Sequence, residues 1–130
     1  MKCGETMSKV SVDFSIENAS QSQAFNSEGV FKDNVLIFHD EKNQKHRLHF
    51  EGKALYYTRG GDPSFEFTFE NNVEHTGMYY VGNQTMAFTI QTHQFSHQNS
   101  SVTLTYTLKQ GDIVVNHSEL SLTYQSVQEA

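Results

Sequence analysis

The sequence predicts an all-β protein in which an antiparallel up-and-down meander of about eight to ten strands closes into a barrel. Apolar and polar residues alternate with a period of two in one short run after another, which is typical of strands with one buried face. Short turns containing Gly, Asn or Asp separate these runs. No segment shows the apolar spacing of a long amphipathic helix. A two-sheet sandwich or jelly roll is the second architecture that fits.

The clearest strand is Phe65–Phe69, where three phenylalanines share one face while Glu66 and Thr68 lie on the other. The run Leu55–Arg59 precedes it, and Gly60–Pro63 separates the two with the only proline of the chain. This composition predicts a hairpin. The remaining strands repeat its alternation, so we expect sequential antiparallel pairing and closure, which removes exposed sheet edges.

Alternation of the same kind predicts four strands before this hairpin. The run 10–17 alternates most regularly. Gly29 falls inside the second run, where we expect a bulge or bend. In the fourth run, His46 shares its face with Leu48 and Phe50. The four expected ranges are 10–17, 24–31, 35–40 and 45–51.

Further runs follow the hairpin, and Gly82-Asn83 predicts a tight turn between two of them. We expect 93–100 to be a polar connection held by Phe95. Residues 1–7 and 126–130 are expected to be loose ends of a single domain that spans 1–130. The expected ranges after the hairpin are 74–81, 85–92, 102–108, 113–115 and 120–124.

Composition and charge limit the cellular location and the partners that we expect for this protein. The chain has one cysteine, Cys3, so it cannot form an internal disulfide, and we expect a cytoplasmic location. It has neither an apolar stretch of membrane-spanning length nor an apolar signal segment at its start. Residues 61–130 carry the whole net charge of −6, which disfavours nucleic acid as a partner.

Several short motifs follow one another over residues 8–125. They are Arg59-Gly60-Gly61, Phe65–Phe69, Tyr80-Val81-Gly82, Met86-x-Phe88-x-Ile90-x-Thr92, Leu104-x-Tyr106, Leu120-x-Leu122-x-Tyr124 and Phe38-x-Asp40. Their order and spacing resemble the YwiB-like family, uncharacterised proteins of Gram-positive bacteria with a lipocalin-like (calycin) barrel. The resemblance implies that barrel and no established activity. This sequence departs from the family in a shorter second strand region and in a longer 82–85 segment.

Arg59 breaks the pattern of its strand, because it lies on the same face as Leu55 and Tyr57. A buried guanidinium needs a partner. A structural partner would be Asp40, Asp62 or a carbonyl of the turn. A functional partner would be the carboxylate or phosphate of a small amphipathic ligand. Calycin barrels are similar in lining the lumen with aromatic residues below a polar group. The expected ligand-binding residues are Arg59, Tyr57, Phe67, Met86, Phe88 and Tyr106.

No catalytic constellation is visible, so we expect no enzyme and no cofactor. There is no nucleophile elbow of the Gly-x-Ser-x-Gly type. A metal site is not expected, because the seven histidines form no His-x-His pair, and His46 and His49 fall on opposite faces of their strand. His93 and His97 are expected to flank a polar loop.

The alternative function is a protein-interaction or structural module with a filled barrel and no ligand. It would act through its outer face or an exposed edge. The basic residues Lys42, Lys45, Arg47 and Lys53 cluster in the sequence and could meet an acidic partner. That partner could be a second copy presenting its Glu66, Glu70 and Glu74 face. A homodimer is therefore also an expectation.

Overall fold

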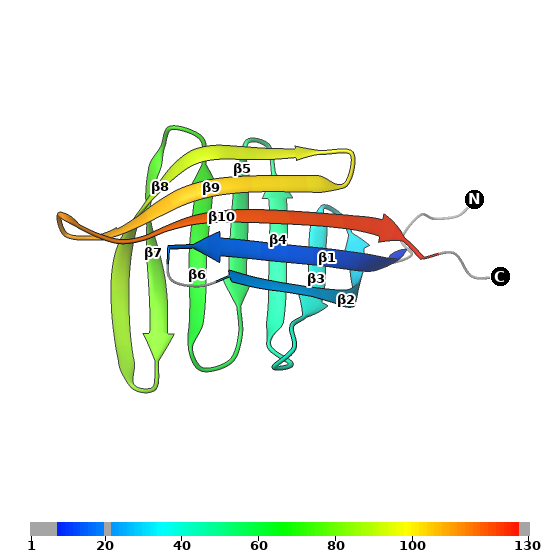
Figure 1. Ribbon diagram of the computed structural model, residues 1–130, viewed down its shortest axis with the longest axis horizontal. Coiled ribbons are helices and arrows are strands. Elements are labelled where there is room, and N and C mark those ends of the chain that lie inside the picture. The colour runs from blue at the N-terminus through cyan, green and yellow to red at the C-terminus, as the bar shows by residue number, and fades with distance from the viewer. Residues whose placement is uncertain (1–7, 20–21, 128–130) are drawn as a thin grey trace.

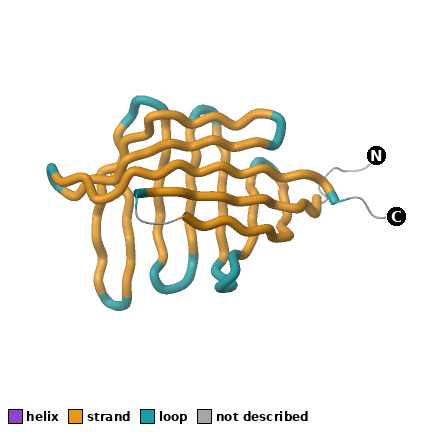
Figure 2. The backbone as a smooth tube through the Cα atoms, in the orientation of Figure 1, coloured by secondary structure: helices purple, strands orange, loops and turns teal. Residues whose placement is uncertain are grey.

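The structure, a computed structural model, describes residues 8–19 and 22–127. In these residues, ten strands follow one another in a single closed sheet, shown as arrows in Figure 1 and in orange in Figure 2. The strands are β1 (Ser8–Asn18), β2 (Ser22–Lys32), β3 (Val35–His39), β4 (Lys45–Glu51), β5 (Ala54–Arg59), β6 (Ser64–Glu70), β7 (Glu74–Val81), β8 (Gln84–Gln98), β9 (Ser101–Gln110) and β10 (Ile113–Ser126).

Each strand pairs antiparallel with its neighbours in sequence, and the barrel closes between its first and last strands. The β1–β10 ladder runs from Val10 opposite Ser126 to Asn18 opposite Ser118. In Figure 1, β1, β9 and β10 cross the direction of β4–β7. The predicted all-β meander barrel is confirmed, and its closed ten-stranded order agrees with a lipocalin-like barrel.

The inward faces of the strands form one apolar core. Leu55 and Tyr57 point inward as predicted, and so do Phe67 and Phe69 of the next strand. Burial of these alternate side chains supplies the main driving force for the fold. The largest side chains that are almost fully buried are Phe38, Phe69, Leu36, Leu48, Leu55, Ile90, Leu104, Leu120 and Leu122.

Four local predictions need correction. Residues 93–98 are not a loop but part of β8, which continues past a bulge between Thr92 and Gln94. The side-chain amide of Asn71 holds this stretch, accepting from the N–H of Phe95 (2.7 Å) and donating to its carbonyl (2.9 Å). The expected ranges 113–115 and 120–124 belong to one strand, β10, with a shift of register between Val114 and Asn116.

At Gly29, the ladder with β1 is continuous and the ladder with β3 ends in the pair of Gly29 with Phe38, so of the predicted bulge or bend no bulge is seen in either ladder. Glycine is needed for a different reason, since a Cβ would run into the carbonyl oxygen of Ile37. Two neighbouring backbones approach closely at this point.

The end of the chain is more ordered than predicted. β10 includes Ser126, and the N–H of Val127 donates to the carbonyl of Lys9 (3.0 Å). Residues 1–7 and 128–130, and with them Cys3, lie outside the described residues. Across 8–19 and 22–127 there is no helix with the length and apolar character to cross a membrane.

Candidate functional site

Three turns lie at one end of the barrel, along the lower edge of Figure 1. They are 40–44 between β3 and β4, 60–63 between β5 and β6, and 82–83 between β7 and β8. The N–H of Gly60 donates to the carbonyl of Lys45 (2.9 Å), and the N–H of Gly82 donates to Oδ1 of Asp62 (2.8 Å). These bonds tie the turns together, and we call this end of the barrel the mouth.

A row of residues crosses β3–β8 at the mouth, each directly opposite the next in the register of neighbouring strands. The mouth row consists of Phe38, His46, Arg59, Phe65, Tyr79 and Met86. Phe65, Tyr79 and Met86 are only partly buried and pack against the core from this end. The mouth therefore presents partly buried apolar side chains on the β6–β8 side of the Arg59 cation.

Within the mouth row, His46 is buried and makes two hydrogen bonds. Its Nε2 lies 2.9 Å from Oδ2 of Asp40, and its Nδ1 lies 2.7 Å from the hydroxyl of Tyr57. Both contacts are satisfied if neutral His46 donates from Nε2 to the carboxylate and accepts the Tyr57 proton at Nδ1. The ring also stacks on Phe38, with centroids 4.8 Å apart.

Burial controls the protonation of this group of side chains. It lowers the pKa of His46 below its ordinary value of 6.5, and the charges of Arg59 and His39 act in the same direction against the opposing effect of Asp40. Burial would raise the pKa of Asp40, but hydrogen bonds from His46 and two backbone N–H groups lower it overall. Burial also raises the pKa of Tyr57 far above its ordinary value, so its hydroxyl stays protonated.

Asp40 also organises its own turn. Its Oδ1 accepts from the N–H of Lys42 (2.9 Å) and of Gln44 (3.0 Å), while Oδ2 faces His46. Both carboxylate oxygens are therefore engaged within the protein. Because Tyr57 lies inside the core, the chain from Asp40 through His46 to Tyr57 anchors the turn to the barrel wall.

Arg59 is the second polar member of the mouth row, and its hydrogen bonding is incomplete. One terminal nitrogen, Nη2, donates to the carbonyl of Pro63 (2.9 Å), and Cζ lies 5.1 Å from the centroid of Phe65. A second nitrogen, Nε, is buried and has no hydrogen-bond partner among the described residues. Of the predicted structural partners, the turn carbonyl is the one that binds Arg59, because Asp40 and Asp62 are engaged elsewhere.

A hollow of about 320 Å³ lies beside Arg59 on the outer wall of the barrel, since most of its lining residues alternate with the inward-facing members of the mouth row. Three cations surround it, and Glu66 is the acidic residue of its lining. Lys53, grouped with these basic residues in the sequence, instead follows β4 at the opposite end of that strand. The predicted basic cluster is therefore divided in space. The lining residues are Lys45, Arg47, Thr58, Arg59, Gly60, Ser64, Phe65, Glu66 and Tyr80.

The residues predicted to bind a ligand occupy two levels. Arg59 and Met86 lie in the mouth row, where both are partly exposed. The other four lie deeper and are all at least nine-tenths buried: Tyr57, Phe67, Phe88 and Tyr106. Tyr57 is directly opposite Phe67, and Phe65 stacks on Phe67 with centroids 4.5 Å apart. The deeper residues thus form the floor beneath the mouth row.

Three other histidines contact side chains of other strands. His93 and His117 both contact the hydroxyl of Thr107, at 2.7 and 2.9 Å. His97 stacks on Phe50 and lies 2.9 Å from the hydroxyl of Tyr124. In the part of the chain that the structure describes, no three His, Cys, Asp or Glu side chains come together as metal ligands would.

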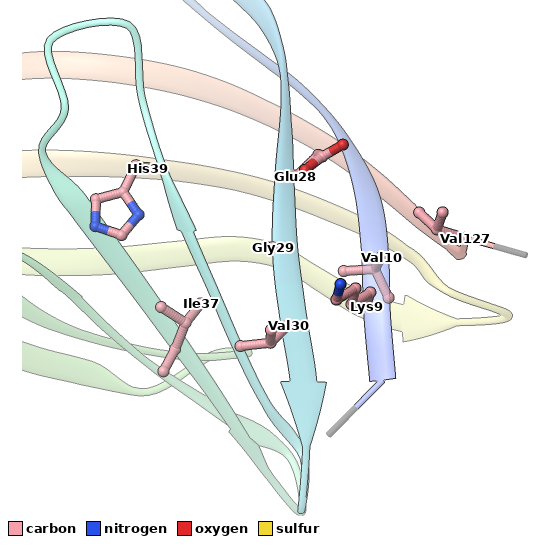
Figure 3. Close-up of a pocket in the computed structure, with 8 residues that line it drawn as sticks. All are labelled: Lys9, Val10, Glu28, Gly29, Val30, Ile37, His39 and Val127. Atoms are coloured by element: carbon pink, nitrogen blue, oxygen red, sulfur yellow. The ribbon is translucent and has the colours of Figure 1, made fainter. Parts of the chain in front are cut away.

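A larger hollow, of about 470 Å³, lies where β1, β2 and β3 meet the end of β10 (Figure 3). Its apolar side chains include Val30 and Ile37, which are directly opposite each other, and its charged ones have both signs. It contains no member of the mouth row. The lining residues are Lys9, Val10, Glu28, Gly29, Val30, Ile37, His39 and Val127.

Comparison with known proteins identifies the family. A family model described as "Domain of unknown function (DUF1934)" matches residues 9–122. The chain belongs to this family. Among solved structures, the DUF1934 barrel described above is similar to that titled "Crystal structure of ywiB protein from Bacillus subtilis", with a TM-score of 0.66 and 12% identity over 95% of this chain and 93% of that one. A search of curated proteins finds no match.

The structural match shows a shared fold and confirms the YwiB-like resemblance of the sequence. Two features of this DUF1934 site were not predicted. One is the chain of Asp40, His46 and Tyr57, for which the signal was a histidine on the face of Leu48 and Phe50. The other is the mouth row itself, which depends on the register between strands.

Proposed function

We propose that this barrel binds a small amphipathic anion at its mouth. The carboxylate or phosphate of the ligand would accept a hydrogen bond from Nε of Arg59. Its apolar part would lie against Phe65, Tyr79 and Met86. The proposal includes a cytoplasmic location, which the single cysteine favours.

The observation that carries the proposal is the buried Nε of Arg59 without a partner among the described residues. A buried donor without an acceptor costs about 1–3 kcal/mol, and more for a charged group. An anionic ligand would remove this cost and bring a charge-assisted hydrogen bond. Lys45 and Arg47 line the hollow beside Arg59, and their positive charges would add to the attraction for an anion.

The volume of the hollow and the packing beneath the mouth row indicate which side chains the ligand would contact. The neighbouring hollow on the outer wall, of about 320 Å³, is at the small end of the range for ligand sites. Inside the barrel, beneath the mouth row, a Cβ at Gly77 would collide with Phe67 and Ile90, so side chains fill that level. The ligand would therefore rest on Tyr57, Phe67, Phe88 and Tyr106 as a floor.

The proposal can be tested with the fluorescent aromatic sulfonate 8-anilinonaphthalene-1-sulfonate as the probe. We expect saturable binding that dodecanoate and dodecyl phosphate displace, and their relative strength would distinguish carboxylate from phosphate. Arg59→Gln should weaken binding by about tenfold to a hundredfold, since a hydrogen bond to a charged group contributes about 1.5–3 kcal/mol.

The matched control is Arg47→Gln, which removes the other arginine of the same hollow. It should weaken binding by less than about threefold, because Arg47 is exposed and contributes mainly long-range attraction. Equal losses in the two variants, or binding that Arg59→Gln leaves unchanged, would show that Arg59 is not the anchor.

A further inference from the structure

The hairpin between β9 and β10 carries apolar residues that the barrel does not cover. Ile113, Val114 and Val115 are 70, 59 and 50% exposed. Ile113 and Val114 precede the bulge at Val115 and point to opposite faces of the strand, so both faces of the hairpin tip are open. Figure 1 shows the tip extending beyond β7 and β8. Three consecutive exposed aliphatic residues at such a place are typical of a contact surface.

The backbone of this segment is open as well. β10 pairs with β9 from Ile113 onward, but its ladder with β1 ends where Ser118 lies opposite Asn18. From 113 to 117, no described strand pairs with the second edge of β10. An unpaired edge of β-branched residues is a template for another strand.

From this edge we infer that two copies of the protein pair antiparallel through residues 113–117 of β10. The arrangement would be a two-fold symmetric dimer centred on Val115, which would face its own counterpart. Ile113 would then lie opposite His117, and Val114 opposite Asn116. This pairing would satisfy the open backbone edge and cover all three exposed aliphatic side chains.

Charge and shape favour a second copy as the occupant. With Val115 at the centre, Asp112 would lie opposite Ser118 and Glu119 opposite Gly111, so no acidic residues would face each other. The hairpin tip projects away from the barrel (Figure 1). Antiparallel pairing of two tips would therefore place the two barrels on opposite sides of the paired tips. A net charge of −6 disfavours an anionic membrane as the occupant.

Sedimentation velocity over a dilution series tests the inference. The wild-type protein should dimerise with rising concentration, and more strongly at higher salt, because salt screens repulsion between two copies of charge −6. Val115→Lys would place two lysines face to face and should weaken dimerisation at least about tenfold. The matched variant Val73→Lys, at another exposed valine, should dimerise as the wild type does.

Disulfide crosslinking tests directly whether the two-fold axis of the dimer passes through Val115. In a Cys3→Ser background, Val115→Cys should form a covalent dimer on oxidation, because directly opposite residues lie within disulfide range. Val73→Cys should not. A protein that stays monomeric, a dimer that Val115→Lys leaves unchanged, or co-flotation with anionic phospholipid vesicles that Val115→Lys abolishes would each overturn the inference.

Discussion

His46 is the residue whose surroundings most constrain its chemistry. It is 4% exposed and lies between the carboxylate of Asp40 and the hydroxyl of Tyr57. In its neutral form, both ring nitrogens have a partner. A second proton would make Nδ1 a donor and displace the Tyr57 hydroxyl hydrogen from its acceptor. Neutral His46 is therefore part of the stable folded state.

This environment predicts a loss of stability at mildly acidic pH. The pKa of His46 is lowered in the folded protein, so the unfolded chain takes up the proton first as the pH falls below 6.5. The free energy of unfolding should then decrease. Burial lowers the pKa of His97 as well, which adds to the same trend. Urea denaturation at about pH 7.5 and about pH 5.5 measures the difference.

The variant His46→Gln should show a smaller loss between these two pH values than the wild type. His49→Gln, on the outer wall of the same strand, should keep the wild-type loss. If His46→Gln had the same pH dependence as the wild type, protonation of His46 would not be the cause.

The sequence singled out Arg59, and a carbonyl of the turn was among the partners expected for it. It indicated no role for His46, although this histidine shares a face with Leu48 and Phe50. The bond between Asp40 and His46 depends on a turn that returns the carboxylate toward the strand, and Asn43 at φ 62° is part of that turn. Alternation of residue types carries no information about such turn geometry.

At the scale of elements, Gly77 in β7 allows the barrel wall to close around its aromatic lining. Gly77 lies opposite Phe88, and a Cβ there would be 2.6 Å from Cδ1 of Ile90 and would also overlap Phe67. The packing between β6, β7 and β8 therefore requires that Gly77 carries no side chain. In the sequence, Gly77 is one residue of the expected strand 74–81, and nothing there marks this close packing.

Gly77→Ala should therefore destabilise the protein by about 1–3 kcal/mol, as is typical when extra volume is forced into a packed core. Gly60→Ala is the matched control, because a Cβ at Gly60 meets nothing within 4 Å. That variant should be neutral or slightly stabilising. Equal denaturation midpoints for the two variants would contradict the described packing around Gly77.

The sequence predicted where the strands lie better than it predicted where a strand continues through a bulge. The period of two identifies 85–92 and 102–108, but bulges at His93 and Val115 shift the alternation within β8 and β10. A shift of one residue looks like the end of a strand in the sequence. The mouth row could not be predicted for a related reason, since it requires the register of five consecutive strand pairs.

At the scale of the whole molecule, barrel closure separates two surfaces with different proposed roles. The mouth gathers Arg59 and partly buried apolar side chains. The exposed aliphatic residues of β10 lie on a hairpin that extends beyond the barrel. Because the two sets share no residue, Val115→Lys should leave anion binding intact, and Arg59→Gln should leave dimerisation intact.

The most direct test of anion binding at the mouth is the NMR signal of the arginine Nε–H groups. The sequence contains two arginines, Arg47 and Arg59, so two such signals can be compared in one spectrum. We predict that titration with dodecyl phosphate shifts the Arg59 Nε–H signal, as a buried donor gains its acceptor, and moves that of Arg47 much less. An unchanged Arg59 signal at saturating ligand would contradict the proposed site.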